Sequence, residues 1–355
     1  YPITPQTHIV EKLAKLKADG EADYEYLRAE SEFAAASIIL GASATGVRSY
    51  SATSSQGLLL MTEVIFNIAG LRLPVVMTCA NRAISAPINI WNDHSDVMTI
   101  RDAGWIHFFA DSNQEAVDLH ILAYKIAEQL RLPVMVNVDG FILTHAFEPV
   151  IIPSSKIIKK FLPNYAPKAD QFLNPKKPMT FGIFATPADY FETRENLHHD
   201  LTASLTIIKK EYKDLMHLLG RKNKDNGLVE YSGPKKPETI LVAMGSVIGT
   251  IRETLKNDQK TGLLKIKTYR PFPAKEVSQI LLTAKNIAVI EKAISLGQAG
   301  PLFSDIQASL PNNQSNIKNY IVGLGGRDIT QKMIREIATD VKKKNDQKIK
   351  FIGKI

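Results

Sequence analysis

Apolar residues recur along the first half of this sequence at two alternating periods. Spacings of three and four residues predict helices over residues 4–20, 31–41, 58–69 and 114–129. Short apolar or alternating runs between them predict strands over residues 48–53, 73–80 and 133–138. Strands that alternate with helices in this way form a parallel sheet covered on both faces, so an α/β fold of that kind is expected.

The pattern changes after residue 153. Prolines recur between Pro153 and Pro187 without a strand pattern, which predicts an irregular connection before a helix over residues 196–219. Residues 223–237 are rich in Lys, Gly and Pro and are interpreted as a linker. Strand patterns resume over residues 239–244, 264–269 and 286–290, with a helix expected over residues 248–256. Residues 321–326 are interpreted as a last strand that runs into a glycine turn. We therefore predict a first α/β domain over residues 1–222, the linker 223–237, and a smaller α/β domain over residues 238–355.

The amino-acid composition limits the kinds of site that this chain can form by itself. The chain has 355 residues, of which 45% are hydrophobic and 23% charged, the proportions of a globular protein with a large core. Its single cysteine, Cys79, excludes an internal disulfide framework. It also excludes a self-contained Cys₄ zinc or iron–sulfur site, because such sites need several thiolates. Any redox metal is therefore expected on a partner.

Hydropathy and charge exclude two further classes of protein. No apolar run approaches the ~20 residues that a membrane-spanning helix needs, and residues 1–5 show no basic region followed by an apolar stretch. A soluble, cytoplasmic protein is therefore expected. The net charge of +8 comes from lysine clusters typical of solvated helix faces and loops, without interleaved stacking aromatics. Binding to nucleic acid is not expected.

The sequence contains none of the common short catalytic motifs. It has no Walker-type phosphate loop and no His-Glu-x-x-His metal helix. The segment Gly323–Gly326 lacks the glycine spacing of a dinucleotide fingerprint and is interpreted as a strand-to-helix turn. His198 and His199 are neighbours on a predicted helix and point in different directions, so they predict no metal site.

Two polar residues lie at predicted helix starts. Glu32 opens an Ala-rich helix whose small side chains allow a flat ring to approach closely, although a carboxylate there is also an ordinary partner of the helix dipole. Thr4 precedes Pro5 in the expected first turn of the first helix, where its hydroxyl and free backbone donors suit an anion. A plain capping role for Thr4 is the simpler alternative.

Arg82 follows the buried strand that ends at Ala80. Parallel sheets bind ligands at the carboxyl ends of their strands, and a guanidinium there suits a carboxylate because it donates two parallel hydrogen bonds. A surface ion pair is the alternative interpretation. The dense polar loop Asn92–Asp96 is unusual for a plain surface, but its residue types alone assign it no role.

Segments spread in order over nearly the whole chain resemble a known family. They are Tyr1–Thr7, Glu30–Glu32, Gly41–Gly46, Ser51–Gly57, Asn81–Pro87, Asp93–Asp96, Arg101–Trp105, Tyr269–Pro273, Ser295–Gln298 and Ile321–Asp328. Together these segments are similar to the alpha subunit of the 2-oxoacid:ferredoxin oxidoreductases, with the pyruvate type (pyruvate synthase) as the nearest match. Members of that family carry a first strand and helix before the motif at Tyr1, which suggests a truncated or trimmed chain.

The resemblance implies a fold and a set of partners. The first domain would be the pyrimidine-binding domain of a thiamine-diphosphate enzyme, and the second would resemble the transketolase C-terminal domain. A beta subunit would bind the diphosphate with Mg²⁺ and carry a [4Fe–4S] cluster. A gamma subunit would help with coenzyme A, and a ferredoxin-like delta subunit would carry further clusters.

The resemblance also implies residue roles. Glu32 would hydrogen-bond the aminopyrimidine ring of thiamine diphosphate and promote its activation, while Arg82 and Thr4 would hold the substrate carboxylate. Gln56 would contact the cofactor, and Asn92–Asp96 would line the site. No metal ligand is implied in this chain.

The implied reaction is oxidative decarboxylation of pyruvate to acetyl-CoA and CO₂, with electrons passed to ferredoxin, and it is reversible. Three alternatives stay open at this point. The first is a branched-chain (2-oxoisovalerate) ferredoxin oxidoreductase subunit, the second a transketolase-like transferase without electron transfer. The third is a non-catalytic scaffold subunit that kept the fold.

Overall fold

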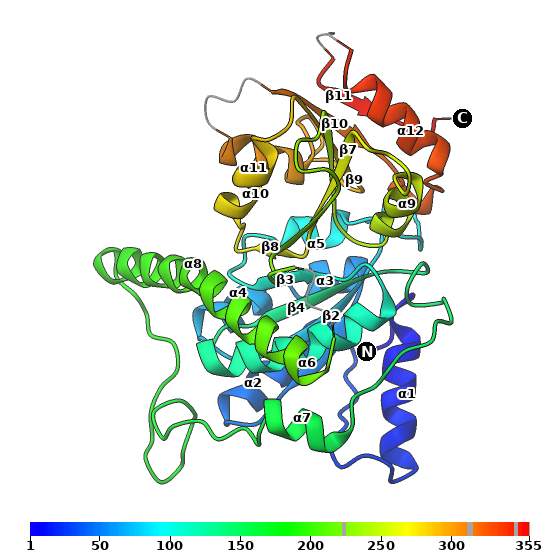
Figure 1. Ribbon diagram of the computed structural model, residues 1–355. Helices are drawn as coiled ribbons and strands as arrows, with labels where there is room; N and C mark the ends of the chain where they lie inside the picture. The colour runs from blue at the N-terminus through cyan, green and yellow to red at the C-terminus, as the bar shows by residue number, and fades with distance from the viewer. Residues whose placement is uncertain (222–224, 311–314, 344–346, 355) are drawn as a thin grey trace.

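The protein forms two stacked α/β units, each built on one sheet (Figure 1). The computed structural model describes residues 1–221, 225–310, 315–343 and 347–354. Within these ranges the first sheet has the strand order β1-β2-β4-β3-β8, and the second has the order β11-β10-β9-β6-β7-β5. All strand pairs are parallel except β3 with β8 and β5 with β7. The expected α/β fold with parallel sheets is confirmed.

Residues 1–221 supply four of the five strands of the first sheet and the helices that cover it. These strands are β1 (Tyr50–Thr53), β2 (Val76–Asn81), β3 (Ile106–Phe109) and β4 (Val134–Asp139). The helices are α1 (Thr7–Ala18), α2 (Glu32–Ala44), α3 (Ser55–Leu60), α4 (Thr62–Gly70), α5 (Ser95–Thr99), α6 (Asn113–Leu130), α7 (Ser155–Phe161) and α8 (Pro187–Leu218). Every residue of β2 and β4 is buried, as expected for the centre of a sheet with helices on both faces.

The second unit repeats the same architecture on a smaller scale. Its strands are β5 (Val229–Ser232), β6 (Thr239–Ala243), β7 (Thr261–Ile266), β9 (Asn286–Glu291), β10 (Asn316–Ile321) and β11 (Ile349–Phe351). Its helices are α9 (Val247–Thr254), α10 (Ala274–Leu281), α11 (Pro301–Ser309) and α12 (Gln331–Asp340), with a 3₁₀ turn, η1 (Leu324–Gly326), after β10. The segment Gly323–Gly326 is thus a turn, as predicted.

Strand β8 (Thr268–Arg270) belongs to the first sheet although it follows β7 of the second sheet directly. It pairs antiparallel with β3, and Phe109 N donates to Lys267 O at 2.8 Å. Two buried lysines form ion pairs at this junction. Lys265 Nζ lies 2.6 Å from Glu115 Oε2, and Lys267 Nζ lies 2.6 Å from Asp225 Oδ2. The apolar run predicted as one strand over residues 264–269 therefore crosses from one sheet to the other.

Several predicted elements differ in extent from the observed ones. Helix α1 begins at Thr7 with Gln6 as its cap residue, so the prediction that Thr4 caps it is wrong. The helix expected over residues 58–69 is two helices that meet at Met61. Residues 229–232 of the segment interpreted as a linker form β5, while residues 222–224 lie outside the described residues. The domain boundaries themselves stay a prediction.

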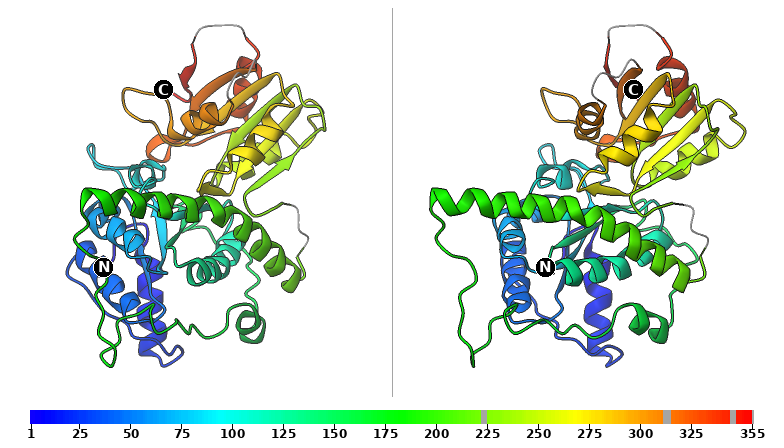
Figure 2. Two further views of the ribbon diagram at one scale, coloured as in Figure 1. Left: turned by 90° about the vertical axis from the view of Figure 1, so that its left-hand side faces the viewer. Right: turned by 60° about the vertical axis from the view of Figure 1, so that its left-hand side comes forward.

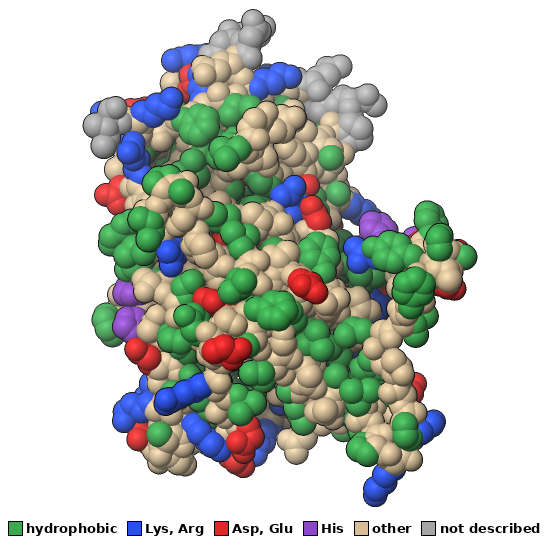
Figure 3. Space-filling view, turned by 180° about the vertical axis from the view of Figure 1, so that it is seen from behind, with side chains coloured by type: hydrophobic (Ala, Val, Ile, Leu, Met, Phe, Trp, Pro, Cys, Tyr) green, Lys and Arg blue, Asp and Glu red, His purple; other side chains and the backbone are tan. Residues whose placement is uncertain are grey.

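Helix α8 crosses the first unit and extends beyond it (Figure 2). Its first turn begins with a capping box, in which Thr186 and Asp189 satisfy each other's backbone groups. Exposed apolar side chains gather on this projecting end, among them Tyr190 and Phe191 (Figure 3). None of the helices in the described ranges combines the length and the apolar composition needed to cross a bilayer.

Candidate functional site

The carboxyl ends of the two sheets face each other across the junction between the units. Asn81 ends β2 and Asp139 ends β4 in the first sheet, whereas Ser246 follows β6 and Lys292 follows β9 in the second. Ser246 N donates to Asp139 Oδ2 at 2.8 Å, which brings the two edges into contact. Because ligands of open parallel sheets bind outside the carboxyl ends of the strands, this junction is where a site is expected.

Glu32 occupies the first position of α2. The preceding residue, Ser31, caps the helix by accepting a hydrogen bond from Ala34 N at 3.1 Å. Glu32 is only 8% exposed, yet its carboxylate accepts no hydrogen bond within the described part of the chain. A Cβ atom built on Gly57 would lie 2.8 Å from Glu32 Oε1. Only glycine therefore allows α3 to approach this carboxylate so closely.

The segment that precedes Gly57 carries further unpaired polar atoms. Thr53 Oγ1, Ser54 Oγ and Gln56 Nε2 are buried and have no hydrogen-bond partner among the described residues. Thr53 Oγ1 lies 2.7 Å from the position that a Cβ on Gly57 would take. Each unpaired buried polar group costs about 1–3 kcal/mol. Their grouping beside an unpaired carboxylate is typical of a place where a polar ligand binds.

Arg82 is held rigidly at the end of β2. Its Nε donates to Asn89 O at 2.8 Å and its Nη1 donates to Thr4 O at 2.9 Å. Nη2 has no acceptor among the described residues, and Arg82 is 8% exposed. Burial lowers the pKa of Arg82, whereas Asp96 acts in the opposite direction. The structure thus brings Arg82 and the backbone of Thr4 together, and Thr4 is exposed.

Asp96 connects the Arg82 segment with the segment around Gln56. Its Oδ2 accepts from Arg82 N at 3.0 Å and from Ser55 N at 3.1 Å. Its Oδ1 accepts from Asn81 Nδ2 at 3.1 Å. Burial raises the pKa of Asp96 from 3.8 to about 6, and the hydrogen bonds oppose this shift. One carboxyl group of the polar loop therefore links the ends of β1 and β2.

The raised pKa of Asp96 predicts a pH-dependent stability. In the folded chain Asp96 binds its proton below about pH 6, and in the unfolded chain below about pH 4. The stabilisation of the fold that results from the raised pKa of Asp96 is therefore complete below pH 4 and is lost as the pH rises through 6. The difference in unfolding free energy between the wild type and Asp96→Asn is expected to fall by about 2–3 kcal/mol over that range. Urea denaturation at a series of pH values measures it, and a pH-independent difference would contradict the assignment.

A second polar cluster fills the junction itself. Lys292 Nζ lies 2.7 Å from Asp139 Oδ2 and 2.8 Å from Asn92 Oδ1. His94 Nε2 lies 2.7 Å from Asp139 Oδ1, and the Ser246 hydroxyl donates to Asp139. Burial by itself would raise the pKa of Asp139, but Lys292 and His94 hold it well below its ordinary value. Asp139 is therefore a buried carboxylate that bridges the two units.

Sequence reasoning found only part of this cluster. The sequence marks the Asn92–Asp96 loop as unusual, but it gives no indication of Asp139, Lys292 and Ser246 as its partners. The position of Asp139 at the end of a buried parallel strand is a signal that identifies it. Lys292 has no local signal, because its partners lie about 150–200 residues away in the chain.

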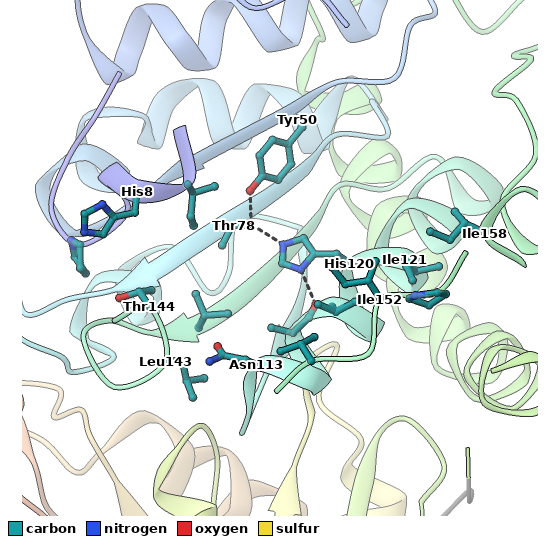
Figure 4. Close-up of a pocket in the computed structure, with 17 residues that line it drawn as sticks. His8, Tyr50, Thr78, Asn113, His120, Ile121, Leu143, Thr144, Ile152 and Ile158 are labelled. Atoms are coloured by element: carbon teal, nitrogen blue, oxygen red, sulfur yellow. Dashed lines mark hydrogen bonds between the residues drawn. The ribbon is translucent and has the colours of Figure 1, made fainter. Parts of the chain in front are cut away.

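A mainly apolar cavity lies on the other face of the first sheet (Figure 4). It has a volume of about 500 Å³ between α1, α6 and the chain before α7. At its polar end Tyr50 Oη lies 2.7 Å from Thr78 Oγ1, which lies 2.6 Å from His120 Nε2. Successive residues of a strand point to opposite faces, so Thr78 faces α6 while Cys79 faces Asp96. Glu32, Gln56 and Arg82 do not line this cavity.

In the described ranges no three His, Cys, Asp or Glu side chains are grouped so that they could hold a metal ion. The sequence predicts no metal site at His198 and His199. These two residues lie on the exposed part of α8. Cys79 is buried, and burial raises the pKa of its thiol well above the ordinary value.

Comparison with known protein families matches both units. Residues 1–213 match the family described as pyruvate flavodoxin/ferredoxin oxidoreductase, thiamine diphosphate-binding. Residues 237–334 match the family described as pyruvate:ferredoxin oxidoreductase core domain II. The chain is 47% identical to pyruvate synthase subunit PorA of Methanocaldococcus jannaschii over 99% of this chain and 92% of that protein. It is 40% identical to ketoisovalerate oxidoreductase subunit VorA of Pyrococcus abyssi, over 97% of this chain and 88% of that one.

A solved structure shares the fold. This is a 2-oxoglutarate:ferredoxin oxidoreductase from Magnetococcus marinus with 2-oxoglutarate, coenzyme A and succinyl-CoA bound. The TM-score is 0.69 at 20% sequence identity, and the likeness covers 96% of this chain and 61% of that chain. At this identity the likeness concerns the fold alone.

Proposed function

The chain belongs to the pyruvate:ferredoxin oxidoreductase family as one subunit of a multi-subunit oxidoreductase, and we propose that Glu32, Arg82, Thr4 and Gln56 are its contribution to a shared active site. The reaction is the coenzyme-A-dependent oxidative decarboxylation of pyruvate, with electrons passed to ferredoxin. The observation that carries the proposal is Glu32, a residue only 8% exposed that is packed against Gly57 and whose carboxylate has no partner in the described residues.

The residues around Glu32 fit the aminopyrimidine ring of thiamine diphosphate. A flat ring with nitrogen donors and acceptors would satisfy both the Glu32 carboxylate and the unpaired Gln56 Nε2. The close approach at Gly57 leaves no side chain in the way. When bound, thiamine diphosphate supplies a nucleophilic carbon and an electron sink for decarboxylation of a 2-oxoacid.

Glu32 would act on that ring by general acid–base chemistry. Its carboxyl group would hold a proton at the ring nitrogen that it faces, which is the proton position that activates the cofactor. The Ser31 cap fixes the start of α2 and therefore the position of the Glu32 side chain.

Arg82 and Thr4 would bind the carboxylate of the substrate. The guanidinium is oriented by Asn89 O and Thr4 O, and its Nη2 remains free for an anion. A 2-oxoacid carboxylate matches this donor group in charge and geometry. The Thr4 hydroxyl lies on the segment that the same arginine holds, so both can contact one ligand.

Other parts of the machinery would belong to partner subunits. A [4Fe–4S] cluster needs four thiolates, and this chain contains Cys79 alone. We therefore propose that beta, gamma and delta subunits hold Mg²⁺, the clusters and the coenzyme A site, with ferredoxin as acceptor. Pyruvate is the proposed substrate because the relatives named pyruvate synthase are more similar than those named ketoisovalerate oxidoreductase, at 47% against 40% identity.

The isolated polypeptide is expected to show no oxidation of 2-oxoacids, whereas the assembled enzyme reduces a dye with pyruvate and coenzyme A. The physical reason is that half of the cofactor site and all redox centres would lie on partners. Dye reduction with pyruvate, 2-oxoisovalerate and 2-oxoglutarate measures both activity and preference. Coenzyme-A-dependent oxidation by the isolated chain would refute the shared site, and a preference for 2-oxoisovalerate would refute the substrate assignment.

A further inference from the structure

The loop that holds Arg82 is itself held by the second unit. Loop residues 89–92 contact the Arg82 segment at three points. Asn89 O accepts from Arg82 Nε at 2.8 Å, Trp91 O accepts from Ala83 N at 3.0 Å, and Asn92 Nδ2 donates to Asn81 O at 3.1 Å. The residues before, at and after the arginine are thus all fixed by one loop.

Lys292 fixes the same loop from the opposite side. Its Nζ donates to Asn92 Oδ1 at 2.8 Å, and its carbonyl accepts from His94 N at 2.9 Å. The amide of Asn92 therefore has a defined orientation, with the oxygen on Lys292 and the nitrogen on Asn81 O. Because Asp139 balances the charge of Lys292 at 2.7 Å, this buried ammonium stays in place.

The glycine turn after β10 supports the loop at a second place. Asn89 Nδ2 donates to Gly325 O at 3.2 Å, and Gly325 N donates to Asp93 Oδ2 at 3.1 Å. A Cβ on Gly326 would lie 2.3 Å from Trp91 Cβ, so only glycine allows this approach. The sequence predicts this motif as a turn, and its close contact with loop residues 89–92 explains the glycines.

We propose that Lys292 is a positioning residue for the substrate arginine and acts from the second unit through Asn92. The inference rests on the proposed function, because it assumes that Arg82 binds the substrate carboxylate. Lys292 would not touch substrate or cofactor. It would keep the guanidinium in the orientation that a carboxylate needs, so its loss would weaken substrate binding rather than cofactor binding.

The test compares Lys292→Met with a matched control in the assembled enzyme. Lys265→Met is the control, since Lys265 is an equally buried lysine that pairs with acids of the first unit but has no contact with the Arg82 loop. Steady-state kinetics should show KM for pyruvate raised roughly tenfold in Lys292→Met relative to Lys265→Met. The affinity for thiamine diphosphate, measured by titration, should match in the two variants.

A second variant avoids the cost of leaving Asp139 unpaired. Asn92→Ala removes the amide link to Asn81 O but keeps the pair between Lys292 and Asp139, so it should fold and still raise KM.

A double variant supplies the decisive readout. If Lys292 acts through Arg82, then Lys292→Met combined with Arg82→Lys should have the same KM as Arg82→Lys alone.

The outcomes separate this inference from the proposed function. If Arg82→Lys raises KM while Lys292→Met and Asn92→Ala behave as Lys265→Met does, the positioning role is wrong and the substrate role of Arg82 stands. Effects on KM that multiply in the double variant also overturn the positioning role. If Arg82→Lys leaves KM unchanged, the proposed substrate role of Arg82 itself fails. Should Lys292→Met not assemble, Asn92→Ala and its double variant with Arg82→Lys decide the matter.

Discussion

Replacing Glu32 by Gln is expected to lower kcat of the assembled enzyme by about 10²–10⁴-fold without unfolding the chain. Gln has nearly the same shape, so it fits beside Gly57 and leaves the Ser31 cap intact. An amide cannot hold the acidic proton that the proposed chemistry needs at the ring nitrogen. The loss should appear in kcat, because the variant would still bind pyruvate but would lack the proton that activates the cofactor.

Glu30→Gln is the matched control for this experiment. Glu30 lies two residues before Glu32 and is exposed, so the same chemical change there should leave kcat within experimental error. Thermal unfolding of both variants checks that the fold is kept. If Glu32→Gln retained more than about a tenth of the wild-type kcat, Glu32 would be an ordinary first-turn residue of α2.

Replacing Arg82 by Lys is expected to raise KM for pyruvate by about one to two powers of ten. Lys keeps the charge but loses the planar fork, which also anchors the side chain on Asn89 O and Thr4 O. A hydrogen bond to a charged group contributes roughly 1.5–3 kcal/mol, and about 1.4 kcal/mol corresponds to a factor of ten. Arg82→Ala should be worse, since neither charge nor donors would face the anion.

The affinity for thiamine diphosphate distinguishes a substrate role from a cofactor role. It should remain nearly unchanged in Arg82→Lys, because this residue is proposed to face the substrate and not the pyrimidine ring. Arg48→Lys is a suitable control, since Arg48 forms an ion pair with Glu128 on the surface and should show ordinary kinetics. An unchanged KM and kcat in Arg82→Lys would remove Arg82 from the active site.

Part of the candidate site could be located from local signals. Glu32 was expected at the start of an Ala-rich helix, and it lies at the first position of α2 with Ser31 as cap. Arg82 was expected at the end of a buried strand, and it follows β2 directly. Both signals are local, because a helix start and a strand end are marked by residues within a few positions. The chemical roles of the two residues remain predictions.

Other features depend on contacts that no local pattern records. Thr4 was expected to cap a helix, but its carbonyl accepts from Arg82, which lies 78 residues away. The strand expected over residues 264–269 divides between two sheets, because Lys267 lies where the backbone passes from β7 to β8. An apolar run shows that a segment is buried, but it does not show in which sheet.

The sequence by itself determined the alternation of strands and helices, the class of fold and the family. These follow from periodicity and from motifs whose residues are close together in the chain. Only the tertiary structure showed that the carboxyl ends of the two sheets meet, and that Lys292 of the second unit reaches Asp139 and Asn92 of the first. The physical reason is that a buried ion pair depends on the distance between side chains in the folded state, and partners 153 and 200 residues apart leave no periodic signal in the chain.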